Sequence, residues 1–157
     1  MNLKEVLSLL SGTLTPLIAI IAIYIAIQQF RLEAIKFRLE TYERRLAIFR
    51  IVRSFIMSIV REAKVDLESC IKFNSDTAEA VFLFEKDVRE YIDKLYREGI
   101  RLMDLGQMLY PVNSSSGLPV GPERSKASAE QSEIVKWFND QRGLSEELFR
   151  KHIGIAA

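Results

Sequence analysis

An uncharged run of 25 residues, from Val6 to Phe30, constrains this chain of 157 residues more than any other feature. Its densest part, Leu17 to Ile27, consists only of Leu, Ile, Ala and Tyr. A helix rises about 1.5 Å per residue, so the run could reach about 37 Å, more than a hydrocarbon core of about 30 Å. We therefore predict that residues 1–29 form an N-terminal tail and a transmembrane helix, with the span at about 9–29.

The start of this helix has two interpretations. Thr15 suits an N-cap and Pro16 a first helical turn, and a helix beginning there would reach only about 22 Å by Phe30. Residues 1–14 would then lie on the membrane surface. The other interpretation, which we favour, is one span with a kink or break near Gly12 to Pro16. A cleaved signal peptide and a buried helix of a soluble protein or an oligomer core remain as alternatives to a membrane anchor.

Basic residues follow the predicted span, whereas Lys4 alone precedes it. The positive-inside rule therefore predicts a single-pass protein of the bacterial inner membrane, with its N-terminus outside and its C-terminal domain in the cytoplasm. The same residues would form a basic collar at the membrane surface, made of Arg31, Lys36, Arg38, Arg44 and Arg45.

Beyond Phe30 the apolar residues recur at helical spacing, and neither Gly nor Pro occurs between Leu17 and Asn74. This pattern predicts one helix that continues from the span as a long stalk. A heptad seam is formed by Leu32, Ile35, Leu39, Tyr42, Leu46 and Phe49. After one extra step of three, the same spacing continues with Val52, Ile56, Ile59 and Ala63. A second stripe contains Phe30, Phe37, Ile48, Ile51 and Phe55. Two stripes are too wide for a simple two-stranded seam, so we expect this helix to pack on more than one neighbour.

Helical periodicity also predicts the rest of the fold. Asp76 and Glu79 resemble a capping box that starts a helix over about 76–108. Residues 109–121 are rich in Pro, Gly and Ser and predict a loop, and Pro122 starts a last helix over about 122–152, with a possible break at Gly143. With the helix over about 30–66, these elements predict an all-α chain. Its residues 30–157 would form an antiparallel three-helix cytosolic bundle.

The residues that carry enzyme chemistry are sparse. Cys70 is the only cysteine and His152 the only histidine, so a His/Cys zinc set cannot be assembled. The glycines lack the spacing of a phosphate-binding loop. We therefore predict a non-enzymatic protein with no metal site, no catalytic residue and no cofactor. Nucleic acid is a poor candidate partner, because Glu40 and Glu43 alternate with the basic side chains of the stalk and the C-terminal part of the chain is acidic.

Small residues recur at intervals of three or four along the predicted span. Such a face allows close helix contact in lipid and predicts a homo-oligomer. Its members are Gly12, Thr15, Ala19, Ala22 and Ala26.

Four stretches resemble parts of known proteins: LTPLIAIIAIYIAIQQF, FRLETYERRLAIFRIVRSFI, VFLFEKDVREYIDKLY, and LPVGPERS followed later by KWF. With them the chain resembles a group of small uncharacterised bacterial membrane proteins with a single span. The resemblance implies a bacterial or phage source and a helical cytosolic domain. It implies no activity and no catalytic residue.

These patterns predict a single-span membrane protein that works without enzyme chemistry. Its helical cytosolic domain would self-associate or dock an unknown protein partner, as a scaffold or adaptor at the lipid bilayer. The alternative is an oligomeric effector that forms a pore or perturbs the membrane and carries a cytosolic sensor bundle.

Overall fold

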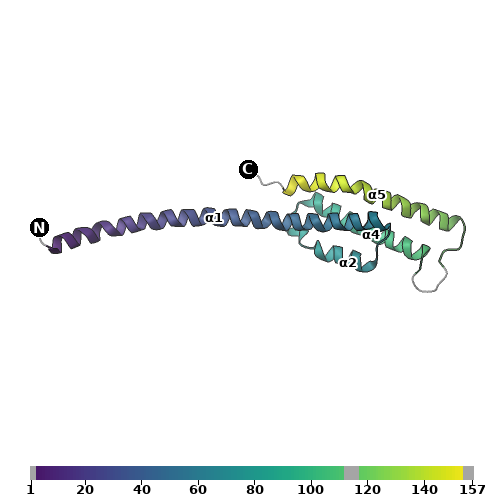
Figure 1. Ribbon diagram of the computed structural model, residues 1–157, viewed down its shortest axis with the longest axis horizontal. Coiled ribbons are helices and arrows are strands. Elements are labelled where there is room, and N and C mark those ends of the chain that lie inside the picture. Colours follow the sequence, from purple (N-terminus) through teal and green to yellow (C-terminus); the bar gives the residue numbers. More distant parts are fainter. Residues whose placement is uncertain (1–2, 112–116, 154–157) are drawn as a thin grey trace. The chain divides into compact units, whose positions relative to one another are not determined.

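The chain is all-α, as predicted (Figure 1). The structure is a computed structural model that describes residues 3–111 and 117–153, with side chains from residue 18 onward. No strand occurs in these ranges. The helices are α1 (Leu3–Glu62), α2 (Leu67–Asp76), α3 (Ala80–Leu83), α4 (Lys86–Leu109) and α5 (Pro122–Ile153).

The chain divides into two compact units, Met1–Glu40 and Thr41–Ala157. The sequence placed this division earlier, between residues 29 and 30. The difference has a simple cause: the first residue of α1 that is buried in the core is Ile48, and the described side chains before Thr41 are exposed, apart from Ala26 and Gln28.

In the second unit, α1 faces the core with residues of both predicted stripes. Ile48 and Phe55 belong to the second stripe, and the buried residues Val52, Ile56 and Ile59 continue the heptad seam. At 3.6 residues per turn, the centre of the seam over residues 32–49 lies about 170° from the centre of the second stripe. Over these residues the two stripes therefore lie on opposite faces of α1 and do not form one wide face.

The segment after α1 differs from the sequence prediction. α1 ends at Glu62, where Ala63 adopts a left-handed backbone with φ of 51°. The Asp66 side chain then caps α2 by accepting from the Ser69 amide at 2.7 Å. This hydrogen bond lowers the pKa of Asp66. The sequence therefore missed α2.

The predicted helix start at Asp76 is wrong, because Asp76 is the last residue of α2 and α4 begins at Lys86. Thr77 follows the last residue of α2. Its buried hydroxyl donates to the carbonyl of Phe73 at 2.8 Å, and its amide donates to the same carbonyl at 3.1 Å. These bonds satisfy one of the carbonyls in the last turn of α2. The expected break at Gly143 is also absent, since α5 is continuous.

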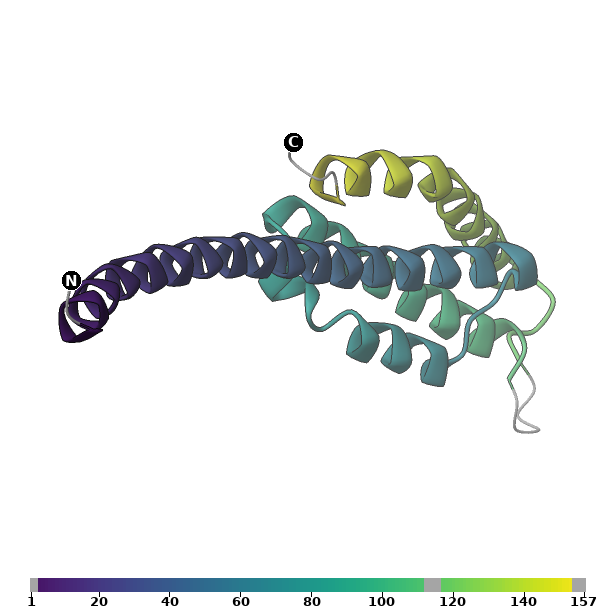
Figure 2. The same ribbon diagram turned by 60° about the vertical axis from the view of Figure 1, so that its left-hand side comes forward.

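The core of the second unit lies between α2, α4, α5 and the C-terminal part of α1 (Figure 2). The bundle thus contains α2 and α3 in addition to the three predicted helices. Phe55 is central: its ring stacks on Phe73 with centroids 4.1 Å apart and meets the edge of Phe138 at 6.1 Å. A second aromatic cluster forms around Phe149. Its ring centroid lies 5.3 Å from that of Phe49 and 5.2 Å from that of Phe84.

Candidate functional site

The apolar segment 18–30 exposes nearly all of its side chains. Ile20 is 65% exposed and Phe30 is 73% exposed, and none of the most apolar window of α1 is buried within the chain. Near the end of this segment, the Gln28 amide donates to the Tyr24 hydroxyl at 3.1 Å. By length and composition, the helix from Ile18 to Glu62, which begins with this segment, is long and apolar enough to cross a membrane.

The predicted self-association face is only partly described. Gly12 and Thr15 lie outside the residues whose side chains the structure describes, whereas Ala19 and Ala22 are exposed and Ala26 is half-buried. The backbone of α1 continues through Pro16, so the helix is not broken there. The face remains a prediction about contacts between copies of the chain.

Four residues of the predicted basic collar are exposed, and the fifth contacts the helical bundle. Arg31, Lys36 and Arg38 are exposed. Arg44 is exposed as well and lies 3.9 Å from the carboxylate of Glu79. Arg45 is half-buried and donates to two backbone carbonyls of the bundle, so its side chain is not directed to solvent as the other four are.

The solvent exposure of the predicted seam residues decreases along α1. Leu32, Ile35 and Leu39 are exposed by more than half. Tyr42, Leu46 and Phe49 are half-buried, and they belong to the second unit. On the opposite face of α1, Phe30 and Phe37 are also exposed. Residues 30–40 therefore present apolar side chains on two opposite sides of the helix.

A polar junction that the sequence did not predict joins α3, α4 and α5. Nε2 of His152, near the end of α5, lies 2.9 Å from Oδ2 of Asp87, in the first turn of α4. The hydrogen bond from His152 lowers the pKa of Asp87. The carbonyl of His152 accepts from Arg45 at 2.7 Å. No sequence pattern could have paired residues that are 65 positions apart.

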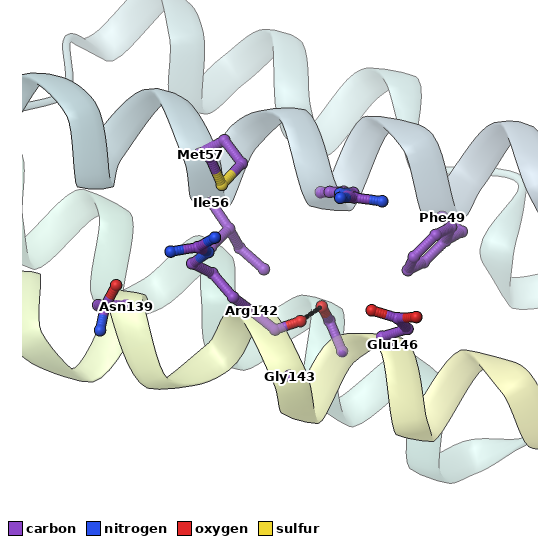
Figure 3. A pocket seen from close by; sticks show the side chains of 9 residues that line it. Phe49, Ile56, Met57, Asn139, Arg142, Gly143 and Glu146 are labelled. Atoms are coloured by element: carbon purple, nitrogen blue, oxygen red, sulfur yellow. Dashed lines mark hydrogen bonds between the residues drawn. The ribbon is translucent and has the colours of Figure 1, made fainter.

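The surface also carries a groove between α1 and α5, with a volume of about 360 Å³ (Figure 3). Arg142 extends from α5 toward α1, and Phe49 and Glu146 lie at one end. Gly143 is one of the residues that line the groove, and a Cβ placed there would meet no atom within 4 Å.

The largest pKa shifts belong to the buried Cys70 and the half-buried Tyr91. Burial raises the pKa of the Cys70 thiol to about 11 and that of the Tyr91 phenol to about 12. Both shifts favour the neutral, unreactive form. Among the described residues, these groups therefore do not form an activated nucleophile or a general base.

Comparison with known protein families, curated proteins and solved structures gives no match to this chain.

Proposed function

We propose that this chain is a non-enzymatic, single-span membrane protein that holds a helical domain at the cytoplasmic face of a bacterial inner membrane. There the domain would self-associate or dock a protein partner, as a scaffold or adaptor. The observation that supports this proposal is the exposed apolar surface of residues 18–40. The predicted resemblance to small bacterial membrane proteins agrees with it.

The energetic argument concerns the isoleucines of residues 18–27. Burying one such side chain is worth about 1.5–3 kcal/mol relative to leaving it in water. The described part of the chain offers no cover for six of them, which are Ile18, Ile20, Ile21, Ile23, Ile25 and Ile27. Contiguous apolar surface of this kind marks contact with a membrane or another protein. A bilayer would cover all sides of the segment at once.

The orientation in this proposal depends on the exposed bases. Arg31, Lys36 and Arg38 directly follow the apolar segment, and a cytoplasmic location of these residues satisfies the positive-inside rule. The C-terminal unit would then lie in the cytoplasm as well.

Membrane insertion is tested with the full-length chain. We expect the wild type to stay in the membrane fraction after alkaline carbonate extraction. The double substitution Ile21→Arg and Ile25→Arg should release it, because each centrally placed charge costs about 2.5–3.5 kcal/mol on insertion. The matched control, Ile21→Leu with Ile25→Leu, should remain in the membrane. Complete extraction of the wild type would overturn the proposal.

Orientation is tested by cysteine labelling. Cys70 is buried, so a variant with Cys70→Ala and Ser128→Cys carries one exposed thiol on α5. We expect a membrane-impermeant maleimide to label this thiol only after the cells are lysed. Labelling of intact spheroplasts would place the C-terminal unit outside the cytoplasm.

The alternative function, a membrane-perturbing oligomer, draws on the two opposite apolar faces of residues 30–40. A helix with apolar strips on opposite sides can contact two neighbours, as a closed ring requires. Leu32 and Ile35 lie on one face and Phe37 on the other. This alternative predicts loss of membrane potential when the wild type is expressed, and suppression of that loss by Ile35→Asn. Unchanged potential and a monomeric mass in lipid discs would exclude it, and the monomeric mass would also exclude self-association.

A further inference from the structure

The junction of α3, α4 and α5 brings together three side chains that can ligate a metal ion. They are Glu85 and Asp87, at the start of α4, and His152, near the end of α5. One ligand atom from each lies within 4.8 Å of the other two. The closest pair is His152 Nε2 and Asp87 Oδ2, at 2.9 Å.

This spacing fits a shared metal ion. Bonds of about 2.1 Å from one ion to an imidazole nitrogen and a carboxylate oxygen place these two atoms about 3.0 Å apart when the bonds meet at a right angle. Right angles between neighbouring ligands are those of an octahedral site. The combination of one imidazole and two carboxylates suits divalent first-row metals such as Zn²⁺ and Co²⁺.

The histidine is held in place by its surroundings. Its side chain is only 15% exposed, and its ring meets the edge of Phe84 with centroids 6.2 Å apart. Its backbone carbonyl is fixed by Arg45. Outer contacts of this kind orient metal-ligating histidines. The ring therefore presents Nε2 to the two carboxylates with little freedom to turn away.

The charges of the site leave room for a cation. Asp87 is hydrogen-bonded to His152, but the side chain of Glu85 makes no hydrogen bond and no ion pair with any described residue. Two carboxylates this close repel each other. A divalent ion would balance both. The positive end of the α4 helix dipole and the positively charged Arg45 nearby both weaken the binding of a cation. Titrations with the metal must therefore extend through the micromolar range.

We propose that Glu85, Asp87 and His152 bind one divalent transition-metal ion and so link the end of α5 to the start of α4. The ligands come from helices that are otherwise joined through the core. Binding would therefore stabilise the second unit, by an amount that grows with the logarithm of the metal concentration above the Kd. This inference does not depend on the proposed membrane function.

The experiment uses the full-length chain in lipid discs, prepared without a histidine tag and stripped with a chelator. Co²⁺ is titrated while its visible absorption is recorded, and Zn²⁺ binding is measured by calorimetry and by the midpoint of thermal unfolding. We expect one ion per chain, weak octahedral Co²⁺ bands and a Zn²⁺-dependent rise of the midpoint. His152→Gln should weaken binding at least tenfold, and Asp87→Asn should do the same.

Two further variants separate ligation from folding. Glu85→Gln removes a ligand from an exposed side chain without a packing role, so its fold is retained, and it should weaken Zn²⁺ binding several-fold. Glu90→Gln is the matched control on the same helix, since it pairs with Lys86 outside the site, and should leave the affinity unchanged. Absence of binding by the wild type would overturn the proposal. Equal binding by the wild type and the Glu85 and His152 variants would overturn it too.

Discussion

Nη1 of Arg45 donates a hydrogen bond of 2.7 Å to the backbone carbonyl of His152, 107 positions further along the chain. Nε of the same guanidinium donates to the carbonyl of Leu83 at 2.9 Å, and the group lies 5.8 Å from the centre of the Phe84 ring. Leu83 ends α3 and His152 lies in the last turn of α5. Carbonyls at helix ends lack partners within their own helix. One arginine of α1 therefore satisfies the ends of two other helices.

The first prediction concerns this arginine. Replacing Arg45 by Met should lower the free energy of unfolding by about 2 kcal/mol, because hydrogen bonds to a charged group contribute about 1.5–3 kcal/mol. Arg45→Lys should recover only part of this loss, since an ammonium lacks the planar fork that reaches two carbonyls. Trp137, the single tryptophan, lies in the second unit and reports urea unfolding by its fluorescence.

The control for Arg45 is its neighbour. Arg44 and Glu79 form an exposed ion pair at 3.9 Å. Exposed pairs of this kind contribute about 0–1 kcal/mol, so Arg44→Met should change stability much less. If both substitutions cost the same, the two carbonyl contacts of Arg45 do not stabilise the bundle.

The second prediction compares two glycines inside helices. A Cβ at Gly143 would meet no atom within 4 Å, so Gly143→Ala should stabilise the protein by about 0.5–1 kcal/mol through helix propensity alone. A Cβ at Gly99 would come within 3.0 Å of the Phe55 ring, which is stacked on Phe73. Gly99→Ala should therefore destabilise. The midpoints of urea unfolding of the two variants test whether the substitutions have opposite effects on stability. Equal shifts of the two midpoints would contradict this prediction.

The third prediction concerns the centre of the core. Phe138 is fully buried and contacts Phe55 and Trp137 edge-on. Phe138→Ala should cost about 3–5 kcal/mol, because it removes a large apolar group and leaves a cavity. Phe82 is 89% exposed, and Phe82→Ala should change stability by less than about 0.5 kcal/mol. Equal losses for the two variants, measured by urea unfolding, would contradict the described core.

The fourth prediction concerns pH and Cys70. Its pKa is about 11 in the folded chain, above the ordinary value of 9.0, because the thiol is buried. The unfolded chain therefore releases this proton at lower pH than the folded chain, and stability falls as the pH rises from about 9 to 11. Comparing wild type with Cys70→Ala between pH 8 and 11 isolates this contribution. The variant should lose less stability over that range, and parallel profiles would refute the assignment.

Helix content was predictable from the sequence, because long amphipathic patterns without Gly or Pro leave few other structures. The start of α5 at Pro122 was also predicted, since proline suits a first helical turn. The boundary at Asp76 was not predicted, because the residues around Asp76 are compatible both with the start of a helix and with the end of one. Cys70 and Phe73 hold α2 against the core, and a local sequence pattern does not reveal that tertiary contact.

The candidate sites divide in the same way. The exposed apolar segment was predicted correctly, since a charge-free run of this length is visible in the sequence itself. The side of α1 that faces the core was not predicted. Helical periodicity alone indicated two apolar stripes and gave no reason to expect that Ile48 would be buried in preference to Leu46. The pairing of Asp87 with His152 depends on how the start of α4 meets the end of α5, and a local pattern carries no record of that contact.

The place of Phe138 and Phe149 in the last helix has a consequence for synthesis on the ribosome. Both rings complete aromatic clusters whose other members, including Phe55 and Phe84, are translated much earlier. The part of the buried face of α1 that packs against α5 therefore stays uncovered until nearly the whole chain has been made. A nascent chain that stalls within residues 112–116 would expose that face to chaperones and proteases, so the finished bundle depends on the prompt arrival of its final helix.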